Sequence, residues 1–305
     1  RTYVEMIDAL ATGERVDLLV DDEDTEARVR SMLSARNVRF HQIKSADVWI
    51  RDYGPIFVKK GGREGRVTAT KWKFNAWGAK YDDLFADDET GLEIAESTGL
   101  EIFRTGIVLE GGSIDVNGKG ALLTTEQCLL NKNRNPRMGK AEIEQYLRDY
   151  LGTTNIVWLG RGIAGDDTDG HVDDISRFVG EDTVVCMTEE DPRDENHVVL
   201  KRNHELLSKC RDSEGRRLEV IPIAMPRKLA ADDGRLPASY ANFYIGNSVV
   251  LMPVFGDEKN DTRAIETLSG LLPRRKVVPI NCRELVYGFG GIHCITQQQP
   301  AARGS

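Results

Sequence analysis

The sequence predicts a mixed α/β fold. Short strand-like apolar runs alternate with amphipathic stretches along its 305 residues, a pattern typical of mixed α/β proteins. No linker divides the chain, so we expect residues 1–305 to form one domain, although the length alone would allow two. Polar motifs recur at intervals of roughly 50 to 70 residues, from Asp52 through Glu110, His171 and Asn242 to Cys294, as in repeat architectures. This spacing suggests repeated units that each deliver one residue to a common centre.

The expected elements follow from the apolar patterns in chain order. We expect strands at 16–20, 38–43, 48–58, 107–109, 120–124, 156–159, 184–187, 220–223 and 249–254. We expect helices at 23–36, 140–151, 198–211 and 261–271, where the pattern is amphipathic. The charged segment 189–196 and the segment 230–238, with its aspartates, glycine and proline, are expected to be surface loops. Residues 301–305 are interpreted as a tail.

Composition narrows the class of protein. With 40% apolar and 30% charged residues, the chain lies within the range of globular proteins. Its formal charge of -8 disfavours a nucleic-acid partner, which would call for a basic patch, and agrees with a small cationic substrate. No apolar stretch reaches the roughly 18 residues of a membrane span, and no signal-peptide pattern opens the chain. Five cysteines without framework spacing favour a reducing, cytoplasmic location.

The segment 290–299 contains a candidate nucleophile. Cys294 lies in an apolar run flanked by Gly288, Gly290 and Gly291, and glycines allow the main chain to approach a ligand closely. An unpaired cysteine is more often a small buried hydrophobe, so Cys294 alone is a weak signal. The other four cysteines lack the two-residue spacing of zinc or dithiol sites and are interpreted as structural.

Four further segments combine reactive side chains with glycine, namely 49–55, 109–113, 165–174 and 239–247. Each alone is also explained as a turn, a loop or a buried strand. His171 and Asp173 are two residues apart, so in an extended chain both would project from one face. The carboxylate would then orient the imidazole and favour its charged form. Together with Cys294, these groups meet the requirements of thiol catalysis.

The carboxylates of Asp52, Glu110 and Asp173 separate two chemistries. Acyl transfer by a cysteine peptidase or amidase develops an oxyanion, which neighbouring acids would oppose. A planar guanidinium instead matches carboxylates in bidentate geometry while a thiolate attacks its central carbon. The carboxylate surplus therefore favours guanidine chemistry over a cysteine peptidase or amidase.

On these segments, together with 74–78, 128–136 and 292–300, the chain resembles the agmatine deiminases of the peptidyl-arginine deiminase-like family, in the guanidine-modifying (pentein) superfamily. The resemblance implies a pentein five-bladed α/β propeller with pseudo-fivefold symmetry and a site in its central channel. It also implies a hydrolase of amidine C–N bonds that converts agmatine to N-carbamoylputrescine and ammonia in polyamine biosynthesis. Arginine or peptidyl-arginine deimination is the nearest alternative, and an inactive guanidinium-binding module is the alternative of another class.

The resemblance assigns roles by position in this sequence. It implies that Cys294 is the nucleophile, that His171 is the general acid and base, that Glu110 orients His171, that Asp52 and Asp173 hold the guanidinium, and that Trp49 and Trp77 line the pocket. It implies no metal and no organic cofactor. It suggests a homo-oligomer that acts on a small cationic guanidine, without a nucleic-acid or membrane partner.

The sequence departs from the family pattern in two places. Relatives usually carry, ahead of Thr2, a segment with a Pro-Ala-Glu-Trp opening and a Trp-Pro pair; without it, we expect an incomplete first blade. At Asp169 relatives more often carry asparagine, so this chain adds a carboxylate near His171. The remaining histidines are interpreted as surface or packing residues, with the role of His293 left open because it adjoins Cys294; they are His41, His197, His204 and His293.

Overall fold

The computed structural model describes residues 1–60, 65–212, 214–232 and 234–301. Within them, five successive units each join two parallel strands through a helix. In four units a further strand pairs antiparallel with the first parallel strand, giving three-stranded sheets, whereas the N-terminal sheet has two strands. The fold is therefore mixed α/β with several small sheets, as the sequence predicts.

The bounds of the elements follow the chain. The parallel pairs and their helices are β1 (Val16–Val20), α2 (Glu23–Met32) and β2 (Val38–Gln42); β4 (Val67–Lys73), α5 (Asp87–Ser97) and β5 (Ile102–Val108); β7 (Ala121–Thr125), α7 (Lys140–Leu151) and β8 (Asn155–Leu159); β10 (Thr183–Thr188), α8 (Asn196–Leu207) and β11 (Glu219–Ala224); β15 (Val249–Val254), α9 (Glu258–Leu271) and β16 (Lys276–Asn281). The antiparallel strands are β3 (Ile56–Lys59), β6 (Ile114–Val116), β9 (Ser176–Phe178) and β14 (Tyr244–Ile245). The shorter or separate elements are α1 (Thr2–Leu10), α3 (Ile50–Tyr53), α4 (Ala76–Ala79), α6 (Glu126–Leu129), the pair β12 (Ala230–Ala231) and β13 (Gly234–Arg235), and the 3-10 turns η1 (Asp82–Leu84), η2 (Gly111–Ser113), η3 (Val172–Asp174) and η4 (Leu285–Gly288).

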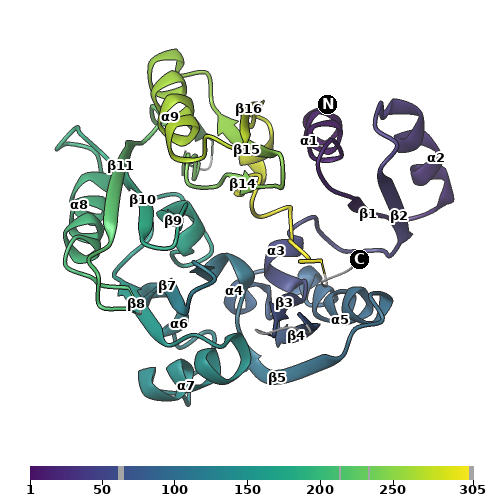
Figure 1. The fold of residues 1–305 in the computed structure, drawn as a ribbon, viewed down its shortest axis with the longest axis horizontal. Coiled ribbons are helices and arrows are strands. Elements are labelled where there is room, and N and C mark those ends of the chain that lie inside the picture. The colour runs from purple at the N-terminus through teal and green to yellow at the C-terminus, as the bar shows by residue number, and fades with distance from the viewer. Residues whose placement is uncertain (61–64, 213, 233, 302–305) are drawn as a thin grey trace.

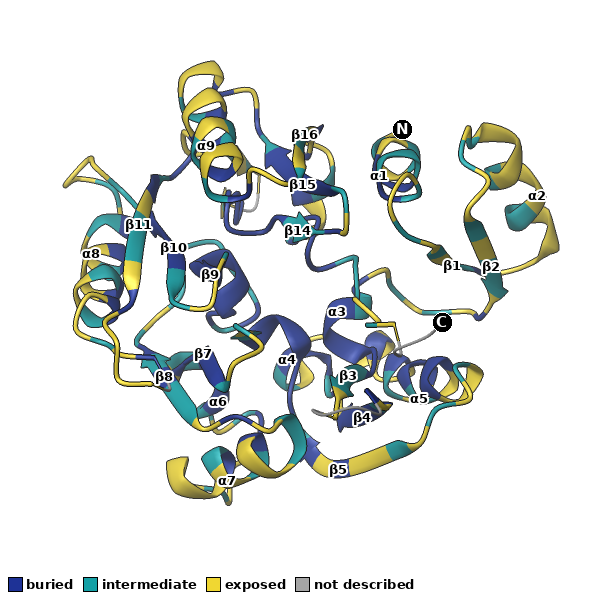
Figure 2. Cartoon of the chain, in the orientation of Figure 1, coloured by how far each residue is buried: buried dark blue, intermediate teal, exposed yellow. Residues whose placement is uncertain are grey.

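The sheets surround a common centre (Figure 1), and the connecting helices α2, α5, α7, α8 and α9 lie on the outer side. The short helices α3 and α4 lie closer to the centre, where the C-terminal segment also returns. Burial follows this arrangement, because the exposed residues gather on the outer helices while α3, β7 and β9 are mostly buried (Figure 2). The protected side chains are thus at the centre, whereas α2 buries no residue at all.

Helix α7 shows how the sequence forms the outer helices. Ile143 and Leu147 are four residues apart and therefore share one face, and each is at most 1% exposed. Burying each of these side chains stabilises the fold by about 1.5–3 kcal/mol. At the N-terminus the Glu142 carboxylate accepts a hydrogen bond from the Gly139 N–H. At the C-terminus Gly152 has a φ of 67°, a left-handed conformation that glycine adopts without strain.

The structure confirms most of the predicted elements. β1, α7 and β15 have the predicted bounds, and α2, α8 and α9 are confirmed with shifted ends. The structure also contains α1, α5, β4 and β16, which the apolar patterns do not reveal. None of the helices in the described ranges is both long and apolar enough to cross a bilayer.

Two of the predicted segments need correction. The strand expected at 48–58 is wrong in its first half, because the Gly54 N–H binds the Ile50 carbonyl and closes the helical turn α3. Only its second half is extended, as β3. The loop expected at 230–238 contains the antiparallel pair β12 and β13. Most of the expected tail, residues 302–305, lies outside the described residues.

Candidate active site

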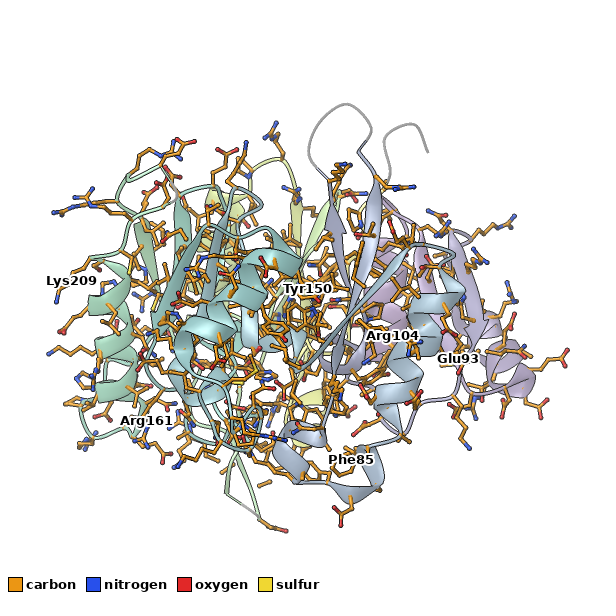
Figure 3. The ribbon with its side chains drawn as sticks, turned by 90° about the horizontal axis from the view of Figure 1, so that it is seen from below. Phe85, Glu93, Arg104, Tyr150, Arg161 and Lys209 are labelled. Carbon is orange, nitrogen blue, oxygen red and sulfur yellow. The ribbon has the colours of Figure 1, made fainter. Side chains whose placement is uncertain are left out.

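Cys294 lines a cavity of about 430 Å³. The same cavity is lined by three other residues predicted from the sequence, Trp49, Asp52 and Trp77. Leu84 belongs to its wall as well, and the next residue, Phe85, lies at the lower edge of the molecule in Figure 3.

The glycines beside Cys294 make room for side chains of the site. A Cβ atom at Gly290 would lie 2.4 Å from the Trp49 ring, and one at Gly291 would lie 2.5 Å from Asn242 Oδ1. The Cys294 carbonyl accepts a hydrogen bond of 3.0 Å from the Arg51 N–H, which ties the C-terminal segment to α3. These glycines thus allow the main chain to approach protein side chains of the site, whereas the approach to a ligand that the sequence suggested stays a prediction.

Asp52 is fixed in α3 by two hydrogen bonds. Its Oδ2 accepts from Trp77 Nε1 at 2.9 Å, and its Oδ1 accepts from the Gly112 N–H at 3.0 Å. The side chain is buried, so these donors replace the water that it loses. The carboxylate is thus held in one orientation beside the cavity.

Trp77 reaches Asp52 from an unusual turn. All four residues of α4, from Ala76 to Ala79, have positive φ values, between 52° and 89°, and three of the four are not glycine. Left-handed backbone costs roughly 1–2 kcal/mol for each such residue. The turn is held by the Asn75 side chain, which accepts from the Gly78 N–H at 2.9 Å. Such strain is concentrated at functional sites, and here it places Trp77 Nε1 on a site carboxylate.

His171 is fully buried, but its neighbours differ from those predicted. Residues 172–174 form η3, so the extended chain assumed for His171 and Asp173 is wrong. The carboxylate near His171 Nδ1 is that of Asp52, with 3.7 Å from Nδ1 to Oδ1. Burial lowers the pKa of His171 well below its ordinary value, and the Arg134 guanidinium lowers it further. Burial therefore favours the neutral imidazole, the form that can accept a proton from a thiol.

Asp173 is instead paired with His293. His293 Nδ1 lies 2.7 Å from Asp173 Oδ2, and both side chains are buried. The sequence suggested, but left open, that His293 is a surface or packing residue. In the structure, its imidazole orients a carboxylate of the site. Its position next to Cys294 was the only sequence signal. The sulfur of Cys294 lies 4.0 Å from the same Asp173 oxygen.

Glu110 is fully buried and is held by Arg134. Arg134 Nε donates to Glu110 Oε1 at 2.6 Å, and neither side chain is exposed. Arg134 Nη1 also binds Asp169 Oδ2 at 2.6 Å, while Lys80 Nζ lies 2.8 Å from Asp169 Oδ1. The carboxylate of Asp169, which departs from the family pattern, is therefore matched by two cations. The motif 128–136 contains Arg134, but its sequence did not reveal this partner of Glu110.

Three polar atoms of the site are buried without a hydrogen-bond partner, namely Glu110 Oε2, His171 Nε2 and Asp173 Oδ1. Buried polar atoms are paired in the great majority of cases, and unpaired ones are costly. Three of them at one place therefore indicate that the site is built to bind polar groups of a ligand. The two carboxylate oxygens, Glu110 Oε2 and Asp173 Oδ1, can accept hydrogen bonds from a ligand. The imidazole nitrogen, His171 Nε2, can accept or donate one.

The electrostatics of the site favour a cation. Burial and neighbouring carboxylates raise the pKa of Asp52 well above its ordinary range. Burial raises the pKa of Asp173 to about 7, despite two nearby arginines. Burial and the carboxylates of Asp173, Asp174 and Asp52 raise the pKa of the Cys294 thiol well above its usual value. A cation bound among these groups would stabilise their ionised forms.

One cluster has the residue types of a metal site. Ligand atoms of Glu110, Cys128 and His171 lie within 4.8 Å of one another. The Glu110 carboxylate is already paired with the Arg134 guanidinium, and burial raises the pKa of Cys128, which disfavours the thiolate that metals require. These residues therefore suit a proton-handling site better than a metal centre.

The fold and the site define a class: an α/β protein with a thiol, an imidazole and carboxylates arranged for a cationic substrate. The sequence profile of the Porphyromonas-type peptidyl-arginine deiminases matches residues 1–300, and the chain belongs to this family.

Three relatives illustrate the similarity. The chain is 42% identical to the agmatine deiminase of Medicago truncatula, over 87% of this chain and 79% of the relative. The structure of the agmatine deiminase of Enterococcus faecalis matches with a TM-score of 0.90 at 34% identity, covering 98% of this chain and 87% of that one. A cysteine-to-serine variant of C. jejuni agmatine deiminase with substrate bound matches with a TM-score of 0.87 at 32% identity, covering 96% of this chain and 84% of that one.

Proposed function

We propose that this protein hydrolyses agmatine to N-carbamoylputrescine and ammonia through a covalent adduct on Cys294. The observation that carries the proposal is the lining of the cavity, which combines this sulfur with four aspartates and two tryptophans. Carboxylates and aromatic faces both attract a guanidinium. The relatives support the same reaction, because the three described above are agmatine deiminases.

The charge of the cavity supports agmatine over free arginine. Among the described residues that line it there is no arginine or lysine, whereas Asp47, Asp83 and Asp167 line it in addition to Asp52. The α-carboxylate of arginine would meet these acids without a cationic partner. Agmatine ends in an ammonium group instead, which the same acids attract.

In the first half of the proposed reaction, the guanidinium binds between Asp52 and Asp173. Its positive charge lowers the pKa of the nearby thiol, and the thiol proton passes to neutral His171. The sulfur attacks the guanidinium carbon and forms a C–S bond. His171 then protonates the departing amino group, the C–N bond breaks, ammonia leaves, and a thiouronium adduct remains on Cys294.

In the second half, His171 removes a proton from water and the resulting hydroxide adds to the thiouronium carbon. The C–S bond breaks and N-carbamoylputrescine leaves as its carbonyl forms. The hydroxyl proton of the adduct passes to ammonia, and His171 returns the proton taken from water to the sulfur, which restores the thiol and the neutral imidazole. Overall, one guanidinium and one water give one neutral ureido group and one ammonium ion. Glu110 would orient the imidazole through Oε2, the oxygen that Arg134 leaves free.

The architecture around the site is proposed to be a single catalytic domain, a five-bladed propeller with pseudo-fivefold symmetry and the cavity in its central channel. The five parallel strand pairs and the central position of α3 support this arrangement. A cytoplasmic location is supported by cysteines that are all unpaired. The proposed homo-oligomer rests on the family resemblance alone.

The decisive test compares ammonia release from agmatine, arginine and a blocked arginine peptide. We expect turnover of agmatine and at most a trace with the other two. The variant Cys294→Ala should lose at least about 10³-fold in kcat while still binding agmatine in calorimetry. The matched control is Cys186→Ala, because Cys186 is likewise a buried, unpaired cysteine but lies in β10.

Two results would contradict the proposal. Turnover of arginine without turnover of agmatine would refute the substrate. Agmatine binding without any turnover, unchanged by Cys294→Ala, would instead favour a guanidinium-binding module.

A further inference from the structure

Asn242 contacts the sulfur of Cys294 from a segment that precedes β14. Its Nδ2 lies 3.3 Å from Cys294 Sγ and 2.9 Å from Asp174 Oδ1. The side chain is 2% exposed. An amide nitrogen has two N–H donors, so it can bind the sulfur and Asp174 at the same time.

The orientation of this amide is fixed by its other end. The His293 N–H donates to Asn242 Oδ1 at 2.8 Å, which requires an oxygen at that position. The sulfur is also closer to Nδ2 than to Oδ1, at 3.3 Å against 3.6 Å. The nitrogen therefore faces both the sulfur and Asp174, and each polar atom of the amide has a partner.

The sulfur needs such donors because its other polar neighbours are acidic. The carboxylates of Asp52 in α3 and of Asp173 and Asp174 in η3 all oppose its ionisation. The nearby imidazoles of His171 and His293 are held neutral by burial. A backbone hydrogen bond from Gly291 acts in the opposite direction and favours the thiolate.

We propose that Asn242 is a positioning residue that holds the Cys294 sulfur as a thiolate acceptor, with Gly291 supplying a second N–H. The inference rests on the proposed role of Cys294 as the nucleophile. Asp174 holds the amide nitrogen, and Gly291 leaves the space that the amide needs, since a Cβ there would lie 2.5 Å from Asn242 Oδ1. The chain thus stabilises its nucleophile with neutral donors while its carboxylates remain available for the cationic substrate.

The test is the pH dependence of Cys294 alkylation by iodoacetamide, quantified by peptide mass spectrometry to separate Cys294 from the other cysteines. This neutral reagent reports thiolate and requires no deimination. Asn242→Asp keeps the acceptor for the His293 N–H but replaces the donor with an acidic group. We expect its alkylation midpoint to rise by at least about one pH unit, which is a tenfold slower reaction at a fixed pH below the midpoint. Asn242→Ala and Gly291→Ala should shift the midpoint in the same direction.

The matched control is Asn203→Asp in α8. Asn203 is 1% exposed and also uses both ends of its amide, accepting from the Gly160 N–H at 3.0 Å and donating to the Arg161 carbonyl at 2.8 Å. Its variant should leave the midpoint unchanged. Circular dichroism will establish that each variant is folded.

The outcomes separate this inference from the proposed function. Folded Asn242 variants with the wild-type midpoint would overturn the inference even if agmatine is turned over. A shifted midpoint in a protein that releases ammonia from neither agmatine nor arginine would refute the proposed function and support the inference.

Discussion

At the scale of single residues, Arg134 is the cation that neutralises the acidic side chains of Glu110 and Asp169 beside the site. It binds Glu110 through Nε and Asp169 through Nη1, each at 2.6 Å, and it donates through Nη2 to the Thr168 carbonyl at 2.7 Å. A buried charge is costly when its partner is removed. Among the described residues Glu110 forms an ion pair with Arg134 alone, whereas Asp169 also has Lys80.

Asp169→Asn should therefore be nearly silent. Asparagine tolerates the positive φ of 67° at this position, and Arg134 keeps its bond to Glu110. We expect kcat/KM for agmatine to stay within about threefold of the wild-type value, a difference below 1 kcal/mol.

Arg134→Met provides the contrast in stability, because it leaves Glu110 buried without a counter-ion. We expect the free energy of unfolding, measured with urea, to fall by about 3–5 kcal/mol. A large loss of activity in Asp169→Asn would show instead that its carboxylate acts on His171 directly.

At the scale of elements, short turns rather than long helices and strands position the site. Asp52 lies in α3, Asp173 lies in η3, and His171 directly precedes η3. The turn η2 contacts both α3 and η3. Gly112 in η2 is the closest contact, because a Cβ there would lie 2.5 Å from His171 Nδ1 and 2.9 Å from Asp52 Oδ1. Any side chain at this position must displace the imidazole or the carboxylate.

Gly112→Ala should thus reduce activity without unfolding the protein. A displacement of about 1 Å at a reacting group costs on the order of 10²-fold in rate, so we expect a fall of that size in kcat for agmatine. The matched control is Gly270→Ala near the end of α9, where no atom lies within 4 Å of an added Cβ. It should keep full activity. Equal kcat values for the two variants would contradict the close contact of Gly112 with His171 and Asp52.

The same turns explain where the sequence misleads at this scale. Amphipathic helices such as α7 were predicted because their apolar spacing is local and repeats every turn. The helical turn α3 lies inside an apolar run that is typical of a strand, and the left-handed turn α4 has no pattern of its own. Both are held by distant partners. In α3 the Arg51 N–H binds the Cys294 carbonyl, and just before α4 the Asn75 side chain binds the Asn133 carbonyl.

At the scale of the whole molecule, the buried carboxylates couple ligand binding to stability. The pKa of Asp173 is raised by burial to about 7 in the folded protein, above the value of about 3.9 in an unfolded chain. The folded state therefore binds this proton more tightly, and the associated stability is lost as the pH rises through about 7. A bound cation offsets that loss by stabilising the carboxylate.

We expect agmatine to raise the Tm of the inactive Cys294→Ser variant more at pH 8 than at pH 6. The physical reason is that the Asp173 carboxylate is ionised at the higher pH and then gains most from a cation. Differential scanning calorimetry at one agmatine concentration measures both shifts. The control ligand is putrescine, which carries amines but no guanidinium and should give a smaller shift. A larger Tm shift at pH 6 would contradict the assigned direction of the pKa.

The sequence by itself determined the chemistry and the fold class. The residue types at Cys294, His171 and the three carboxylates predicted guanidine chemistry, and local apolar periodicity predicted mixed α/β elements. The tertiary structure alone decided which groups act together: Asp173 binds His293, Glu110 binds Arg134, and Asn242 reaches the sulfur. The two partners lie 120, 24 and 52 residues apart in the sequence, respectively. Their pairing depends on how the units pack around the centre, which no local sequence pattern specifies.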